Sequence, residues 1–333
     1  MGMTHGSAST EVHLRNGVVG DWQLDDAAFL ESFRLPTSAD KVEALALANP
    51  LARDGQVELL EEDHHYVVTN PDRSRVRVPA SVTGLLSQFH EEFDADAAIN
   101  LMRKGPSWAA KRRQYLRADG SEMSAEEIKT AWALNGEISR KRGVLMHFHI
   151  EQHLNGVCVD EPRSPEFLQF LDFELEVLRE RGLRPWRSEL SIFHCGLRLA
   201  GQCDLLCLDA DGRVVVVDWK RSKDVARSCR FRRMLLPLVG LDDCNYNHYA
   251  LQLNLYRYVL ETEYSVDVSG MLLGAFHPSH ETYRCIEVPP MPGELDLLLA
   301  HLRGLGAAGE PEPGPSAVFP GVPEDEEGAP GDP

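Results

Sequence analysis

The 333-residue sequence lacks any long apolar run. A transmembrane helix needs about 20 consecutive apolar residues, and a signal peptide needs a shorter apolar stretch close to its first residue. Neither pattern occurs. We therefore expect a soluble, intracellular protein with no membrane partner. The sequence leaves nucleus, cytoplasm and organelle open.

A disulfide framework is also missing. The chain has seven cysteines, an odd number without regular spacing. Small secreted domains instead use even, regularly spaced sets. We therefore expect free thiols in a reducing compartment. Cys203 and Cys207 fall on an expected strand, where small buried residues are the simplest interpretation.

Basic residues are scarce, and this argues against binding nucleic acid through overall charge. The chain has 34 Lys and Arg against 52 Asp and Glu, a formal charge of −18. No basic residue follows Arg303, whereas seven acidic residues do, which leaves −11 for the rest. Because local clusters matter more than the sum, we expect only modest, salt-sensitive binding to duplexes.

The chain divides into three parts by composition. Residues 1–60 are polar and helix-prone, and we interpret them as an accessory segment that includes a short helix over residues 41–48. Residues 61–303 carry the expected core. Residues 304–333 are rich in Gly, Pro and Glu with little to bury, which predicts a disordered acidic tail and a candidate docking segment for a protein partner.

The pattern of the central part predicts an α/β fold with a mixed central sheet flanked by helices and helical N-terminal additions. Strands are expected at residues 186–193, 199–208, 214–219 and 271–276, and a small hairpin at residues 65–78. Helices are expected at residues 82–93, 124–155, 167–181 and 248–261. Ser124 and Glu127 have the spacing of a capping box, and Ser81 is placed to cap the first of these helices.

The segment Asp218-Trp219-Lys220 is the most informative feature that is present. It follows four consecutive valines, typical of a strand buried on both faces. A tight turn ending at Gly212 should pair this strand with the preceding one and bring Asp204 to the same end of the sheet. Asp218 and Lys220 should share one face, with Trp219 on the other. Burying this group unpaired would cost several kcal/mol, so a metal or a phosphate is its natural partner.

Two helices should add to this group. His147 and Glu151 lie one turn apart on an expected helix, and Gln252 and Tyr256 repeat that spacing on another. The resulting order is Gly-x-x-x-His147-x-x-x-Glu151, then Gly201-x-x-Asp204, then Asp-x-Lys, then Gln-x-x-x-Tyr.

This order resembles the PD-(D/E)XK nuclease superfamily, specifically its RecB-like exonuclease branch. Similar proteins include mitochondrial genome-maintenance exonucleases and viral and algal relatives. The diagnostic residues lie between Arg140 and Tyr258, and Ser81-Val82-Thr83 resembles a short element that precedes the first helix in relatives. The resemblance implies the PD-(D/E)XK core and a deoxyribonuclease that uses Mg²⁺ or Mn²⁺, with two ions. An exonuclease acting on single-stranded or open DNA ends is expected, in repair, recombination or replication. A structure-specific endonuclease and a catalytically silent nucleic-acid-binding platform are the alternatives.

The resemblance also implies the roles of the central residues. His147, Asp204 and Asp218 would bind metal, and the peptide carbonyl of Trp219 would complete the ligand set. Lys220 would contact the scissile phosphate and the attacking water. A salt bridge between Lys220 and Asp218 is compatible with this role.

Four further residues surround this group. Glu151 would orient a neighbouring ligand. Glu189 resembles a recurrent family glutamate and is interpreted as an ion-pair partner rather than a ligand. Gln252 would bind substrate or Lys220. Tyr256 would either approach the phosphates or belong to the core, with equal weight for each.

A basic run follows the Asp-x-Lys strand. Such a run is usually only solvated, but beside a scissile phosphate it favours contacts to the DNA backbone. The predicted substrate-binding residues are Arg221, Lys223, Arg227, Arg230, Arg232 and Arg233, together with Ser81 and Thr83. Some relatives bind an iron–sulfur cluster through a closely spaced C-terminal set of cysteines. Only Cys285 follows Cys244 here, so no cluster is expected.

Overall fold

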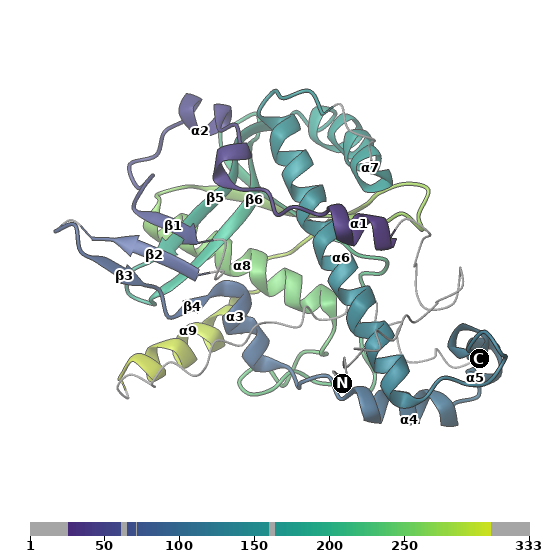
Figure 1. Cartoon of the computed structure of the whole chain (residues 1–333). Coiled ribbons are helices and arrows are strands. Elements are labelled where there is room, and N and C mark those ends of the chain that lie inside the picture. Colours follow the sequence, from purple (N-terminus) through teal and green to yellow (C-terminus); the bar gives the residue numbers. More distant parts are fainter. Residues whose placement is uncertain (1–25, 61–64, 71, 160–163, 308–333) are drawn as a thin grey trace, which may run out of the picture.

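A computed structural model describes residues 26–60, 65–70, 72–159 and 164–307. A six-stranded mixed sheet lies at the centre of this part of the chain (Figure 1). Its strands are β4 (Ala80–Ser81), β5 (Arg184–His194), β6 (Leu199–Leu208), β7 (Val214–Arg221), β8 (Val268–Phe276) and β9 (Arg284–Glu287). The pairs β4–β6 and β7–β8 are parallel, and the pairs β5–β6, β6–β7 and β8–β9 are antiparallel. The α/β class predicted from the sequence is therefore confirmed.

Helices cover both faces of the sheet. They are α1 (Asp26–Ser32), α2 (Ala44–Ala48), α3 (Val82–Leu86), α4 (Ala95–Lys104), α5 (Trp108–Lys111), α6 (Ala125–Leu154), α7 (Pro165–Phe173), α8 (Asn245–Glu263) and α9 (Pro292–Ala307). Short segments of other helical type are η1 (Ser38–Asp40), η2 (Ser87–Phe89), η3 (Arg112–Tyr115) and η4 (Glu174–Arg179). One apolar core joins α3, α8 and α9 to the sheet, and a second joins α6 and α7 to its other face.

The β6–β7 hairpin explains how the two aspartates come together. Leu205 pairs with Val217 and Leu208 with Val214, and Gly212 adopts a positive φ of 76° in the turn, as the sequence predicts. The valines are buried because the sheet is covered on both faces. The ladder stops at the Leu205–Val217 pair, immediately before Asp204 and Asp218.

The long helix α6 begins where the sequence indicates. The Ser124 side chain accepts a hydrogen bond from the Glu127 N–H, and the Glu127 carboxylate accepts one from the Ser124 N–H. This reciprocal capping box fixes the first turn of the helix. Met146 and Ile150 then pack into the second core. This contact sets which face of α6 looks toward the sheet, and His147 lies between these two positions.

The described residues before β4 also contact the core. A separate antiparallel sheet consists of β1 (Val57–Leu60), β2 (His65–Thr69) and β3 (Arg75–Arg77), so the predicted hairpin gains a third strand. Asp54 forms a two-pronged ion pair with the buried Arg187 of β5. The Asn155 side chain accepts a hydrogen bond from the Leu45 N–H at 2.8 Å. Residues 41–60 are therefore part of the packed structure.

Several predicted boundaries differ from the structure. The helix capped by Ser81 ends at Phe89 rather than near Phe93, where His90 becomes extended. Helix α2 begins at Ala44, three residues after the predicted start. Helix α9 continues to Ala307, past the predicted start of the tail. The rest of the tail and residues 1–25 lie outside the described residues.

Candidate active site

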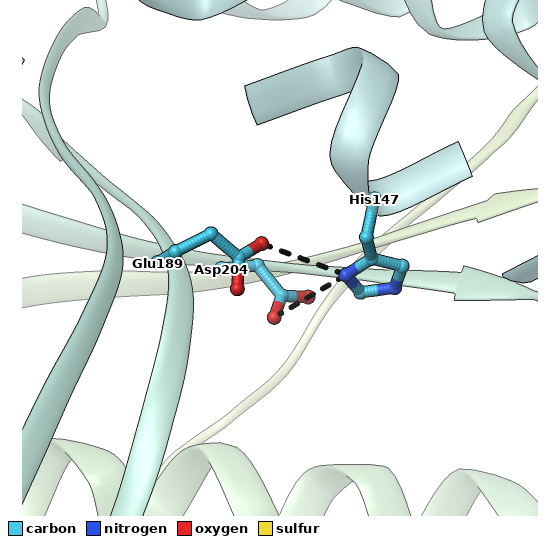
Figure 2. A group of neighbouring side chains, drawn as sticks. All are labelled: His147, Glu189 and Asp204. Carbon is cyan, nitrogen blue, oxygen red and sulfur yellow. Dashed lines mark ion pairs between the residues drawn. The ribbon is translucent and has the colours of Figure 1, made fainter. Parts of the chain in front are cut away.

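His147, Glu189 and Asp204 bring an imidazole and two carboxylates together from α6, β5 and β6 (Figure 2). The Nδ1 atom of His147 lies 3.7 Å from Glu189 Oε1 and 3.7 Å from Asp204 Oδ1. One ligand atom from each residue lies within 4.8 Å of the others. Ligand atoms bonded at about 2.1 Å to one cation must lie within about 4.2 Å of each other. Small side-chain movements would therefore let all three bind one ion.

The backbone of Glu189 is strained at this position. Its φ is +45°, in the left-handed region that a non-glycine residue rarely adopts. The neighbouring pairs Ser188–Leu205 and Leu190–Cys203 keep the β5–β6 register on either side, and the Gln202 amide donates to the Glu189 carbonyl at 3.1 Å. Figure 2 shows the Glu189 carboxylate directed toward His147. Strain of about 1–3 kcal/mol held by its surroundings is common at functional sites.

Asp218 and Lys220 lie on the same face at the end of β7. Lys220 Nζ is 2.6 Å from Asp218 Oδ2, and Asp218 is 1% exposed. Trp219 points to the opposite core, where it packs edge-on against Phe170 and Phe173. This arrangement follows the alternation expected for an extended strand.

The Asp204 side chain bonds to the backbone of β7 just beyond the end of the β6–β7 ladder. Its Oδ2 atom accepts a hydrogen bond of 2.7 Å from the Trp219 N–H. This bond satisfies a backbone donor that has lost its place in the β6–β7 ladder, and it holds Asp204 beside Asp218. The two aspartates are thus fixed by backbone geometry as well as by charge.

Helix α8 contributes the Gln252 and Tyr256 pair. The Gln252 amide donates to the Tyr256 hydroxyl at 2.8 Å and approaches Asp218 Oδ1 at 3.4 Å. Tyr256 is 3% exposed and lies in the core, yet its hydroxyl reaches the site through Gln252. Its ring also explains Gly201, because a Cβ there would lie 2.5 Å from Tyr256 Cε1. Tyr256 therefore belongs to the core, and its approach to the phosphates stays a prediction.

The ionisable groups perturb one another strongly. Burial raises the pKa of Asp218 to about 6, although Lys220 opposes this shift. Burial also raises the pKa of Asp204. Burial would lower the pKa of His147, but the Asp204 and Glu189 carboxylates prevail and raise it to about 9. The site thus holds more negative charge than its own cations can balance, and it binds protons to compensate.

A comparison with protein families decides what kind of domain carries this geometry. Residues 161–310 match the family model of the PD-(D/E)XK nuclease superfamily. The matched residues include Glu189, Asp204, Asp218 and Lys220, while His147 lies on the preceding helix. Nucleases of this superfamily use divalent metals, so the PD-(D/E)XK domain indicates a metal-dependent nuclease.

Comparisons with curated proteins and with solved structures add no argument about function. No curated protein matches the chain significantly. Among solved structures, the crystal structure of SSO0001 is 14% identical, with 70% of this chain and 77% of that chain covered and a TM-score of 0.26. A likeness this low carries no argument.

The donor set of the PD-(D/E)XK domain fits a hard divalent cation. Three carboxylates and one imidazole converge, and Mg²⁺ and Mn²⁺ favour oxygen ligands with tolerance for imidazole. Asp218 Oδ2 is buried, and Lys220 Nζ at 2.6 Å is the contact that balances its charge. His147, Glu189, Asp204 and Asp218 are therefore the residues suited to hold metal.

Glu151 lies beside this group but outside it. Its Oε2 atom is 3.6 Å from Lys41 Nζ, so its direct partner comes from the segment before β1. Burial raises the pKa of Glu151 to about 7, and the charge of Glu189 adds to the shift. Glu151 thus feels the charge of Glu189, and its role in orienting a neighbouring ligand stays a prediction.

The predicted DNA-contacting residues are not all on the surface. Arg221 is 7% exposed, and its guanidinium donates to Glu166 of α7 at 2.6 Å. Arg221 is therefore removed from the predicted set, because strand alternation turns it toward the Trp219 side. Ser81 caps α3 by accepting from the Gly84 N–H at 2.9 Å, and its hydroxyl lies 3.2 Å from that of Thr83. Arg227, Arg230, Arg232 and Arg233 are exposed.

The sequence-based interpretation of Glu189 was incomplete. It forms an ion-pair contact, and the structure gives His147 as the partner, but it also belongs to the candidate ligand group. Regular strand alternation could not place it there, because its position depends on the positive φ. The sequence offered one sign of this role: Glu189 lies on the strand expected next to the Gly201-x-x-Asp204 strand.

Proposed function

We propose that this protein is a divalent-metal-dependent deoxyribonuclease, and that it acts as an exonuclease on single-stranded or open DNA ends. The observation that carries the proposal is the convergence of Asp204, Asp218 and Lys220 with His147 at the end of β7. A family match to nucleases supports the reaction class. The preference for DNA and for ends is supported by the order of the sequence motifs.

Each group has a distinct role in this proposal. Asp204, Asp218, Glu189 and His147 hold the cations, which supply a water of lowered pKa and polarise the phosphate when bound. Lys220 remains protonated, because the Asp218 carboxylate raises its pKa against the effect of burial. Its ammonium group can stabilise the negative charge that develops on the phosphate. Gln252 restrains Asp218 from the α8 side.

The test uses end-labelled single-stranded and duplex DNA with Mg²⁺, Mn²⁺ or EDTA. The wild-type protein should shorten labelled strands from one end, and EDTA should abolish the reaction. Asp218→Ala and Lys220→Ala should lose cleavage, by at least about 100-fold for Lys220→Ala, while far-UV circular dichroism stays unchanged. Full activity in Lys220→Ala would refute the assignment.

The alternatives predict other results in the same assay. A structure-specific endonuclease would cut closed circles or branched duplexes internally. A silent platform would retard DNA on gels without cleaving it, and its thermal stability need not rise with Mn²⁺.

A further inference from the structure

The segment between β7 and α8, residues 222–244, exposes an unusual apolar surface. Phe231 is 79% exposed, Leu236 75% and Val239 51%. Among the described residues, these form the densest run of exposed large apolar side chains in the sequence. Such a concentration on a surface points to a binding role.

This segment is an ordered structure rather than a loose loop. Met234 and Leu238 are each 1% exposed and anchor it in the core that contains α8. Backbone bonds from the Met234 N–H to Leu241 O and from the Asp243 N–H to Arg232 O form a short hairpin. Phe231 therefore projects from a built support, so its exposure is imposed by the fold.

The charge of the segment identifies the kind of partner. Residues 222–244 contain five basic and three acidic residues, a net charge of +2 in a chain of −18. Arg230 and Arg232 flank Phe231, and Arg233 follows, held by Asp242 at 2.7 Å. An aromatic ring among arginines suits an unpaired nucleic-acid strand, whose bases stack on the ring while its phosphates meet the cations. Bases in a duplex are already stacked on each other and cannot use the ring in this way.

A row of contacts connects this segment to the candidate active site. Lys220 Nζ lies 5.1 Å from the ring centre of Tyr249 on α8. Tyr246 lies one turn earlier on the same helix face, and Arg227 Cζ is 4.8 Å from its ring centre. The segment therefore starts two residues after Lys220, and its Arg227 lies against the first turn of α8.

We propose that Phe231 and the arginines beside it hold the unpaired strand next to the cleavage site, Phe231 by stacking on a base and the arginines by contacting phosphates. This assignment rests on the proposed nuclease function and names its substrate as an unpaired strand.

The test measures binding without cleavage. Full-length Asp218→Ala protein is titrated against fluorescein-labelled oligothymidylate and against a blunt duplex of equal length, by fluorescence anisotropy. Adding Phe231→Ala should weaken oligothymidylate binding about tenfold and duplex binding by no more than about twofold. Phe231→Trp should keep the affinity, and Leu236→Ala, an exposed apolar control in the same segment, should change it by no more than about twofold.

Three outcomes would overturn the proposal: unchanged oligothymidylate affinity in Phe231→Ala, an equal loss for both DNAs, or an equal loss in Leu236→Ala. The last would indicate a general apolar surface for a protein partner. Because the assay requires no turnover, a wild-type protein that cleaves nothing would refute the proposed function and leave this test intact. Equal melting temperatures of the variants show that the fold is preserved.

Discussion

Replacing Asp218 by asparagine should stabilise the metal-free protein. Burial raises the pKa of this carboxyl from its ordinary 3.8 to about 6, although Lys220 lies 2.6 Å away. At about 1.4 kcal/mol per pKa unit, holding the group ionised in the folded protein costs about 3 kcal/mol at neutral pH. Asparagine removes this cost and keeps the shape, while Lys220 retains the attraction of Asp204. We therefore expect Asp218→Asn to gain about 1–3 kcal/mol in EDTA.

The stability difference between Asp218→Asn and wild type should depend on pH. A carboxyl with a raised pKa binds its proton more tightly in the folded state, so its penalty is absent below about pH 4 and complete above about pH 6. The advantage of Asp218→Asn should thus grow between these values.

The assay is urea unfolding of both proteins in EDTA at several pH values, repeated at neutral pH with Mn²⁺. Bound metal stabilises only a protein that binds it. Mn²⁺ should therefore raise the unfolding free energy of wild type much more than that of the variant and reverse their order. A variant less stable than wild type in EDTA at neutral pH would refute the reasoning. A matched change at the exposed Asp211, in the β6–β7 turn, should alter stability by less than about 0.5 kcal/mol.

Two further substitutions test the other assignments. Glu189→Gln should weaken Mn²⁺ binding about 10- to 100-fold, measured by isothermal titration, because it removes one carboxylate from the group around His147; unchanged affinity would exclude Glu189 as a ligand. Arg221→Ala should lower the unfolding free energy by about 3–5 kcal/mol, because it leaves Glu166 buried and unpaired. A stable variant with weakened DNA binding would instead restore Arg221 to the surface set.

The sequence predicted those parts of the site that depend on regular geometry. The valine strand, the turn at Gly212 and the alternation along β7 together placed Asp204, Asp218 and Lys220 at one end of the sheet. The capping box at Ser124 located the start of the helix that carries His147. Each of these is a local rule with a short range in the chain.

Features that depend on irregular or distant contacts were not predicted. Glu189 reaches the site through a positive φ, and no periodic pattern encodes such a departure. Lys41 contacts Glu151 across more than 100 residues of sequence, and only the folded structure reveals that pairing. The sequence could have predicted the burial of Arg221, because the alternation that places Trp219 in the core also applies two residues later. It could not have predicted that Glu166 is the partner of Arg221.

The distribution of charge argues against a silent nucleic-acid platform. A platform needs an accessible cationic surface, which residues 222–244 provide by themselves. It does not need three carboxylates around a buried strand end, where burial, and then their mutual repulsion, raises the pKa values of Asp204 and Asp218. Such a group becomes favourable only when a cation balances it, because the free energy of cation binding offsets the cost of burying the carboxylates. The basic segment leaves the end of β7 directly after Asp218 and Lys220, which is the arrangement needed to hold a cation and a polyanion at the same phosphate.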